Sequence, residues 1–128
     1  SRKISLPVDN EIMKAIIKFS ALEYKGLEND SAHTVLNLLN IGSAQIITVP
    51  GEALPNIGYY IKRKMKTRKP FLFGLTNDAF GYMLTKVDFD SFKRYGYISQ
   101  TSLSEMVGEV YINEVLDWLK QAPASEME

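Results

Sequence analysis

Apolar and polar positions along the start of the chain predict one strand followed by one helix. The run 4–8 (ISLPV) alternates weakly and contains Pro7, which is typical of an edge strand or an extended lead-in. Apolar residues then recur at helical spacing over 11–24. Asp9 or Asn10 stands where a helix cap is needed, and either side chain can accept hydrogen bonds from the first turn.

Two strand-like runs follow a turn at residues 26–31. The first covers 33–42 (HTVLNLLNIG) and the second covers 44–49 (AQIITV), with Gly42 and Ser43 around the join. Because so short a link leaves no room for a crossover, the two runs predict an antiparallel hairpin.

The centre of the chain has the pattern of a strand, a helix and a second strand. Pro50 and Gly51 end the run at 44–49, and residues 53–66 then carry an apolar stripe at helical spacing. The run 71–75 (FLFGL) is almost continuously apolar, so we expect a strand that is buried on both faces. The short links predict a βαβ unit with parallel strands and a right-handed crossover.

The last third of the chain is aromatic and irregular before it becomes helical again. Residues 83–89 and 91–99 are predicted to form loop or short strand, and 104–120 a helix capped by Ser102 or Ser104. The tail over 123–128 is predicted to be disordered. The expected fold class is therefore α/β, with a small mixed sheet, a βαβ unit and a C-terminal helix in a single domain over 1–122.

Composition narrows the chemistry that the chain can carry. Hydrophobic residues make up 45% of the 128 positions, and 15 basic side chains cancel 15 acidic ones, so a general nucleic-acid binder is not expected. The absence of cysteine excludes disulfides and thiol catalysis. The sequence shows no signal peptide and no apolar run near the ~20 residues of a membrane helix, so we expect a soluble chain of undetermined compartment. The single histidine, His33, lies within a strand-like run and is expected to be structural.

Two polar turns follow the two strands of the predicted βαβ unit, and they end in Glu52 and Tyr82. Neighbouring parallel strands end at the same edge of a sheet, so we expect the two turns to lie side by side. Gly51 is expected to aim the Glu52 carboxylate through unusual backbone angles, and Asn77 and Asp78 to hold the second loop in shape. On spacing alone, an ordinary helix acid followed by a plain turn remains the alternative.

The string ITVPGEALPNIGYYIKR, followed by FLFGLTNDAFGY, resembles the neutral/alkaline ceramidase family. The shared features are a strand that ends in P-G-E, a following helix, and a second strand that ends in G-L-x-N-x-x-x-x-Y. The stretches NIGSAQIITV and KRYGYISQTSL are also similar to that family. The similarity covers residues 41–108.

The resemblance implies a zinc amidase that cleaves the N-acyl bond of ceramide into sphingosine and a fatty acid. In that family two histidines, a glutamate and a tyrosine hold the zinc, and motif matching places Glu52 and Tyr82 at the last two of these. Tyr95, in K-R-Y, resembles a further site tyrosine that helps to hold the reacting oxygen, with one extra residue intervening here. Zinc binds carboxylate oxygen at about 2.0–2.2 Å and polarises a carbonyl group.

The chain departs from the family at the remaining ligands. The two histidines and the catalytic serine region lie upstream of P-G-E, in motifs that this chain does not contain. We therefore expect the chain to be a fragment, the C-terminal part of a catalytic domain, and to lack amidase activity by itself. The expected partners are a lipid amide substrate and the missing N-terminal part of the same protein.

Two further readings come from other classes of protein. The chain could be a stand-alone, non-catalytic interaction domain that kept the fold without the metal. The basic run 62–69 could contact phosphates or anionic lipid head groups, although the solvated face of a helix explains that run better. Apolar surface left bare by a missing half of the domain would also favour a homo-oligomer.

Overall fold

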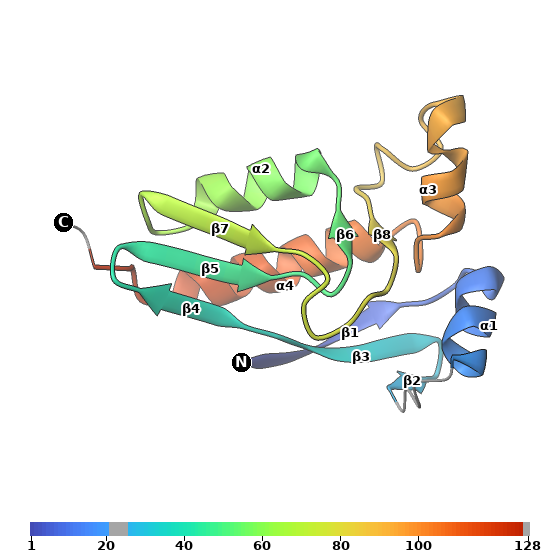
Figure 1. Ribbon diagram of the computed structural model, residues 1–128, viewed down its shortest axis with the longest axis horizontal. Helices are drawn as coiled ribbons and strands as arrows, with labels where there is room; N and C mark the ends of the chain where they lie inside the picture. The colour runs from blue at the N-terminus through green and yellow to red at the C-terminus, as the bar shows by residue number, and fades with distance from the viewer. Residues whose placement is uncertain (21–25, 127–128) are drawn as a thin grey trace.

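The computed structural model describes residues 1–20 and 26–126, which form small sheets backed by helices (Figure 1). Its α/β character, with a βαβ unit and a C-terminal helix, confirms the predicted fold class. In chain order the elements are β1 (Arg2–Pro7), α1 (Glu11–Phe19), β2 (Leu27–Glu28), β3 (Ser31–Leu36), β4 (Leu38–Ile41), β5 (Ala44–Thr48), β6 (Glu52–Ala53), α2 (Pro55–Lys64), β7 (Lys69–Phe73), β8 (Tyr82–Met83), the 3-10 turn η1 (Lys93–Tyr95), α3 (Gly96–Gln100) and α4 (Val107–Gln121).

The strands of the described residues form three sheets. The first has the order β1-β3-β2 and is antiparallel, which confirms an edge strand at the start of the chain. The second has the order β4-β5-β7, with β5 antiparallel to β4 and parallel to β7. The third consists of β6 and β8, which run parallel. The predicted hairpin and the parallel strands of the βαβ unit are therefore both confirmed.

The run predicted as one strand over 33–42 is divided into β3 and β4. Asn37 separates them, and its amide donates a hydrogen bond to the Thr48 hydroxyl at 2.8 Å. The Thr48 amide in turn donates to the Asn37 carbonyl at 3.1 Å. This local exchange replaces one step of the regular ladder, and a period-two pattern does not reveal it.

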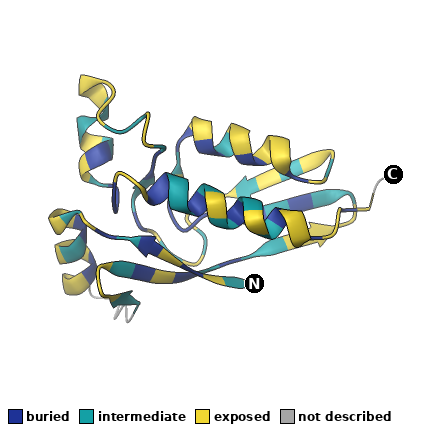
Figure 2. Cartoon of the chain, turned by 180° about the vertical axis from the view of Figure 1, so that it is seen from behind, coloured by how far each residue is buried: buried dark blue, intermediate teal, exposed yellow. Residues whose placement is uncertain are grey.

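The prediction that the strand at 71–75 is buried on both faces is wrong. β7 is an edge strand, and the side chains of Phe71 and Phe73 are 45% and 48% exposed. Leu72 points the other way, toward Gly58 of α2. Figures 1 and 2 show α2 and α4 on the same side of the β4-β5-β7 sheet. A continuous apolar run therefore has one face in the core and one at the surface.

The core lies between the inner faces of the strands and the two long helices. Its members include Leu6, Leu36, Ile47, Ile57, Ile61, Val107 and Val115, all nearly or fully inaccessible. Tyr111 of α4 is the largest fully buried side chain, and its hydroxyl donates to the Thr48 carbonyl at 3.0 Å. Burial raises the pKa of the Tyr111 phenol far above its usual value of 10.0.

Tyr111→Phe is expected to lower the free energy of unfolding at pH 7 by about 1 kcal/mol, because the buried Thr48 carbonyl loses its donor. The raised pKa adds a pH dependence. The folded state keeps the phenol protonated, whereas the unfolded state can ionise it. The contribution of the Tyr111 phenol to the free energy of unfolding is therefore complete below pH 10.0, and it is lost as the pH rises further, by about 1.4 kcal/mol per unit. Urea unfolding between pH 7 and 11.5 should show this slope in the wild type only, so that the two stability curves cross. Parallel curves would contradict the buried phenol.

The helices differ from their predicted bounds at several ends. Asn10 caps α1 by accepting from the amides of Ile12 and Met13, as expected, but α1 ends at Phe19; residues 21–24 of the predicted helix lie outside the described residues. α2 starts at Pro55 because Glu52 and Ala53 pair in β6. The stretch predicted as loop or short strand at 91–99 instead holds η1 and α3.

The last helix starts three residues later than predicted. The Ser104 hydroxyl accepts from the Met106 amide and so holds the turn before α4, which begins at Val107. Across the described ranges, none of the helices has the length and apolar character needed to span a membrane.

Part of the tail beyond α4, where disorder is predicted, packs against the fold. Ser125 is buried, and it donates to the carbonyls of Lys66 and Ser43 through its amide and its hydroxyl. The end of the predicted tail, residues 127–128, lies outside the described residues.

Candidate functional site

The structure brings Glu52 and Tyr82 together on adjacent strands. They are Cα partners in the parallel pair β6–β8, so their side chains leave the ladder on the same face from strands about 4.8 Å apart. Glu52 is exposed and Tyr82 is partly buried. Thirty residues separate the two in the chain, and α2 and β7 lie between them. A carboxylate and a phenol are thus neighbours at the end of the sheet that the βαβ unit forms.

Main-chain hydrogen bonds fasten the two loops to one another. The loop after β5 and the loop after β7 exchange bonds on both sides of Glu52, which fixes its backbone against the segment that leads to Tyr82. The bonds run from Glu52 N to Gly81 O at 2.8 Å, from Leu54 N to Met83 O at 3.0 Å, from Phe80 N to Pro50 O at 2.9 Å and from Leu75 N to Gly51 O at 3.1 Å. The pairing therefore rests on a ladder and does not depend on side-chain contact.

Two glycines permit this close approach. A Cβ atom on Gly51 would lie 2.5 Å from the Gly81 carbonyl oxygen, so this position needs glycine for space. We expected Gly51 to be needed for its backbone freedom, but that reason applies instead to Gly81, whose φ is +76°. A Cβ atom on Gly81 would lie 2.1 Å from the Thr101 carbonyl oxygen. The close passage of three backbone segments thus accounts for both residues.

Asn77 and Asp78 attach the second loop to a strand of the other sheet. Asn77 has φ +73°, and its side-chain amide donates to the Val35 carbonyl at 2.6 Å. The Asp78 carboxylate accepts a hydrogen bond from the Thr34 hydroxyl. The sequence predicts that these side chains hold their own loop in shape. In the structure they hold it through β3, which lies outside the βαβ unit.

Tyr97, for which the sequence predicted no contact with Tyr82, lies against the ring of Tyr82. The two rings meet edge to face with their centroids 6.1 Å apart. Tyr95 ends η1 and packs against Phe92 at 5.5 Å, with the Arg94 guanidinium 5.6 Å from its ring centroid. Tyr97 stands two residues after Tyr95 in the motif Y-G-Y, but the stretch was expected to be loop or strand. Without a predicted helix, the sequence does not show which side chain of this stretch faces Tyr82.

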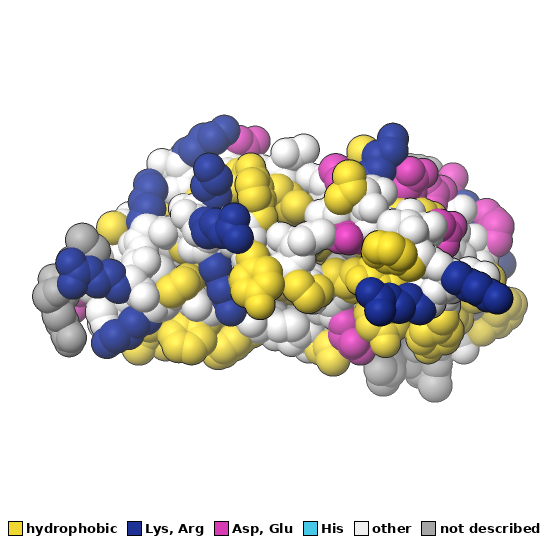
Figure 3. All heavy atoms as spheres, turned by 90° about the horizontal axis from the view of Figure 1, so that it is seen from above, with side chains coloured by type: hydrophobic (Ala, Val, Ile, Leu, Met, Phe, Trp, Pro, Cys, Tyr) yellow, Lys and Arg dark blue, Asp and Glu magenta, His cyan; other side chains and the backbone are white. Residues whose placement is uncertain are grey.

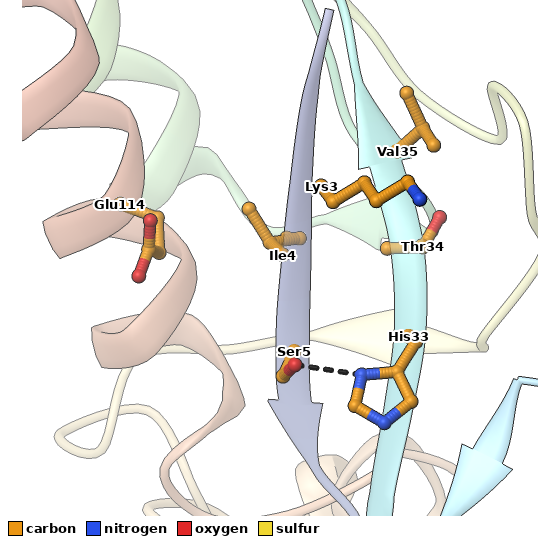
Figure 4. A pocket seen from close by; sticks show the side chains of 7 residues that line it. All are labelled: Lys3, Ile4, Ser5, His33, Thr34, Val35 and Glu114. Atoms are coloured by element: carbon orange, nitrogen blue, oxygen red, sulfur yellow. Dashed lines mark hydrogen bonds between the residues drawn. The ribbon is translucent and has the colours of Figure 1, made fainter.

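His33 lies in a different sheet from Glu52 and Tyr82. Its Nδ1 atom is 2.7 Å from the Ser5 hydroxyl across the β1–β3 pair, and its Nε2 atom is 3.9 Å from the Glu28 carboxylate. Figure 4 shows it at the side of an open cavity that Lys3 and Glu114 also line. The structure, as far as it describes the chain, contains no group of three His, Asp or Glu side chains placed to hold a metal ion.

The basic run at 62–69 is at the surface, and part of it is used within the fold. Figure 3 shows the lysine and arginine side chains gathered on the face that carries α2. Lys66 donates to the main-chain carbonyls of Lys120 and Ala122 at 3.1 and 2.9 Å, and so ties the end of α2 to the end of α4. Lys64 lies 5.7 Å from the ring centroid of Tyr60. These contacts favour the reading of the run as a solvated helix face with anchoring contacts.

Comparison with known proteins gives a likeness of fold. No protein-family model matches the chain, and no curated protein matches it. Among solved structures, the chain is similar to one described as "Ceramidase complexed with C2", with a TM-score of 0.59 and 16% sequence identity. The similarity covers 77% of this chain but 16% of that ceramidase chain, so this chain spans about a sixth of it. At this identity the likeness shows a shared fold alone.

Proposed function

We propose that this chain is the C-terminal portion of a ceramidase-like, zinc-dependent amide hydrolase, in which Glu52 and Tyr82 are two of the zinc ligands. The observation that carries the proposal is their pairing on β6 and β8. The residues that resemble the ceramidase ligands by motif are also neighbours in space. The similarity of fold to a solved ceramidase supports the same reading from an independent direction.

The two side chains can supply two of the ligands of a zinc site. A carboxylate and a phenol both offer oxygen donors, and the shared face of the ladder lets them approach one ion. Catalytic zinc sites need at least three protein ligands, so we propose that two histidines from an upstream segment of the same protein complete this one. Zinc in such a site polarises the amide carbonyl and lowers the pKa of a bound water.

The remaining residues position these two ligands. Gly51 and Gly81 let the two loops run in contact, while Asn77 and Asp78 tie the second loop to β3. The ring of Tyr97 supports the ring of Tyr82 from one side. We propose Tyr95 as the further site tyrosine of the intact enzyme. The substrate class that follows is a lipid amide such as an N-acyl sphingosine.

A turnover assay with a fluorogenic N-acyl sphingosine tests the proposal. The 128-residue chain alone is expected to show no turnover, because two donors hold zinc too weakly for catalysis. The full-length gene product, loaded with zinc, is expected to hydrolyse the substrate. Turnover by the isolated chain, or a zinc-loaded full-length protein that is inert toward lipid amides, would contradict the proposal.

A stand-alone interaction domain is the second candidate function. The observation that favours it is that the described residues hold no group of three His, Asp or Glu side chains placed to bind a metal ion. The gene sequence upstream of Ser1 separates the two candidates. Histidine motifs there support the hydrolase, whereas a start codon directly before Ser1 supports the interaction domain.

A further inference from the structure

The β4-β5-β7 sheet carries an apolar surface on the face that points away from α2 and α4. The register aligns Leu39, Ile46 and Phe71 in one row across the three strands. Side chains in one row of a sheet lie on the same face, and so do side chains two residues apart along one strand. Ile41 and Phe73 therefore extend this row in the two strand directions. We call these five residues the apolar sheet face.

Most of the apolar sheet face is at the surface of the described structure. Leu39 is 44% exposed, Ile41 63%, Phe71 45% and Phe73 48%. Phe71 and Phe73 pack edge to face with their centroids 6.3 Å apart, so they form a fixed ridge along the edge strand. Figure 1 looks onto this side of the sheet, and Figure 2 shows the helices on the opposite side.

The exposed apolar area of this face is that of the largest apolar patch on a typical monomer. About half of each phenylalanine surface gives roughly 100 Å² per ring, and with the aliphatic side chains the face amounts to roughly 400–500 Å². The largest apolar patch on a typical monomer covers about 300–600 Å² and commonly has a function. A standard interface buries about 800 Å² per partner, of which about 65% is apolar in homodimers, or roughly 500 Å². The face can thus supply the apolar centre of a dimer.

We propose that two copies of this chain pack their apolar sheet faces together about a two-fold axis. The axis lies midway between the two sheets and runs parallel to β5. That axis places β7 of one copy over β4 of the other, so that Phe71 meets Leu39, Phe73 packs over the start of β4, and Ile41 meets the aliphatic stem of Lys69. A bulky row thus faces a smaller one on both sides of the axis. Sheets pack face to face about 10 Å apart in this way, and the product has four layers with the helices outside.

Charge supports this occupant. Lys69, in the row of Ile41 and Ala44, is the one charged side chain that the register places on this face among the described strands β4, β5 and β7. The two-fold axis puts the two Lys69 side chains at opposite edges of the interface, where they stay apart; each stem can pack on Ile41 of the other copy while the ammonium group extends past the edge strand into solvent. Glu52 and Tyr82 lie in β6 and β8, outside the face. The dimer therefore stands independently of the proposed hydrolase function.

Sedimentation equilibrium of the 128-residue chain over a range of concentrations tests the dimer. The wild type is expected to dimerise, and Phe71→Asp to weaken dimerisation at least roughly 100-fold, because symmetry places the substitution in the interface twice. Tyr59→Asp is the matched control: Tyr59 is 64% exposed on α2, on the far side of the sheet, and its variant should dimerise like the wild type. A monomeric wild type, which would leave the face for the remainder of a longer protein, overturns the proposal. A dimer that Phe71→Asp does not weaken overturns it as well.

A mixing experiment tests the orientation of the two copies. Leu39→Lys, on the other outer strand of the sheet, is expected to weaken dimerisation by a similar factor. Mixed with Phe71→Asp, it should form a heterodimer, because one pair of facing positions then holds opposite charges and the other pair is native. Two folded but unmixed monomers, checked by circular dichroism, would overturn the two-fold axis along β5.

Discussion

Gly81→Ala is expected to destabilise the fold by about 3 kcal/mol or more, the largest change in stability that we predict. The new Cβ atom would lie 2.1 Å from the Thr101 carbonyl oxygen, far inside contact distance. That oxygen cannot move freely, because it accepts the Tyr82 amide at 3.1 Å. Alanine at φ +76° adds a backbone cost of about 1–2 kcal/mol. Either the loop or the β6–β8 pairing must shift.

Gly96→Ala is the matched control for this prediction. A Cβ atom on Gly96, the first residue of α3, would meet no atom within 4 Å, and alanine favours the helix by up to about 1 kcal/mol. Urea unfolding followed by circular dichroism should show a large drop in midpoint for Gly81→Ala and none for Gly96→Ala. Equal stability of the two variants would mean that the backbone at Gly81 does not pass Thr101 as closely as described.

Glu52→Ala is expected to weaken zinc binding by the full-length protein at least about 100-fold. Removal of a residue that only supports a ligand typically costs about 10–100-fold in metal affinity, and the loss of a ligand should cost more. Stability should change little, because Glu52 is exposed and its main-chain bonds to the neighbouring loop remain. Glu105→Ala, which removes an exposed carboxylate from the turn before α4, is the control and should bind zinc like the wild type.

The sequence predicts the central βαβ unit well because each of its signals is local. A proline and a glycine end β5, a helical stripe marks α2, and an apolar run marks β7. Because the links around α2 are short, parallel pairing of β5 and β7 is the expected topology, and the register of Ile47 with Leu72 confirms it. The juxtaposition of Glu52 and Tyr82 follows from the same reasoning, although their exact pairing as β6 and β8 had no signal of its own.

The features that sequence reasoning missed depend on distant contacts. Phe71 and Phe73 match a fully buried strand as well as an edge strand, because a periodic pattern does not say how many layers cover a sheet. Tyr97 reaches Tyr82 only because α3 packs beside β8. The attachment of Asn77 to β3 likewise joins residues 42 apart in the chain. Local propensity carries no information on such pairs.

The most direct test of the account is a comparison of zinc affinity in four forms of the full-length protein: wild type, Glu52→Ala, Tyr82→Phe and the double variant. If the two side chains hold one ion, each single change should weaken binding strongly, and the double variant should lose less than the sum of the two losses. Wild-type zinc affinity in either single variant, with the fold intact, would contradict a shared metal at the end of these two strands.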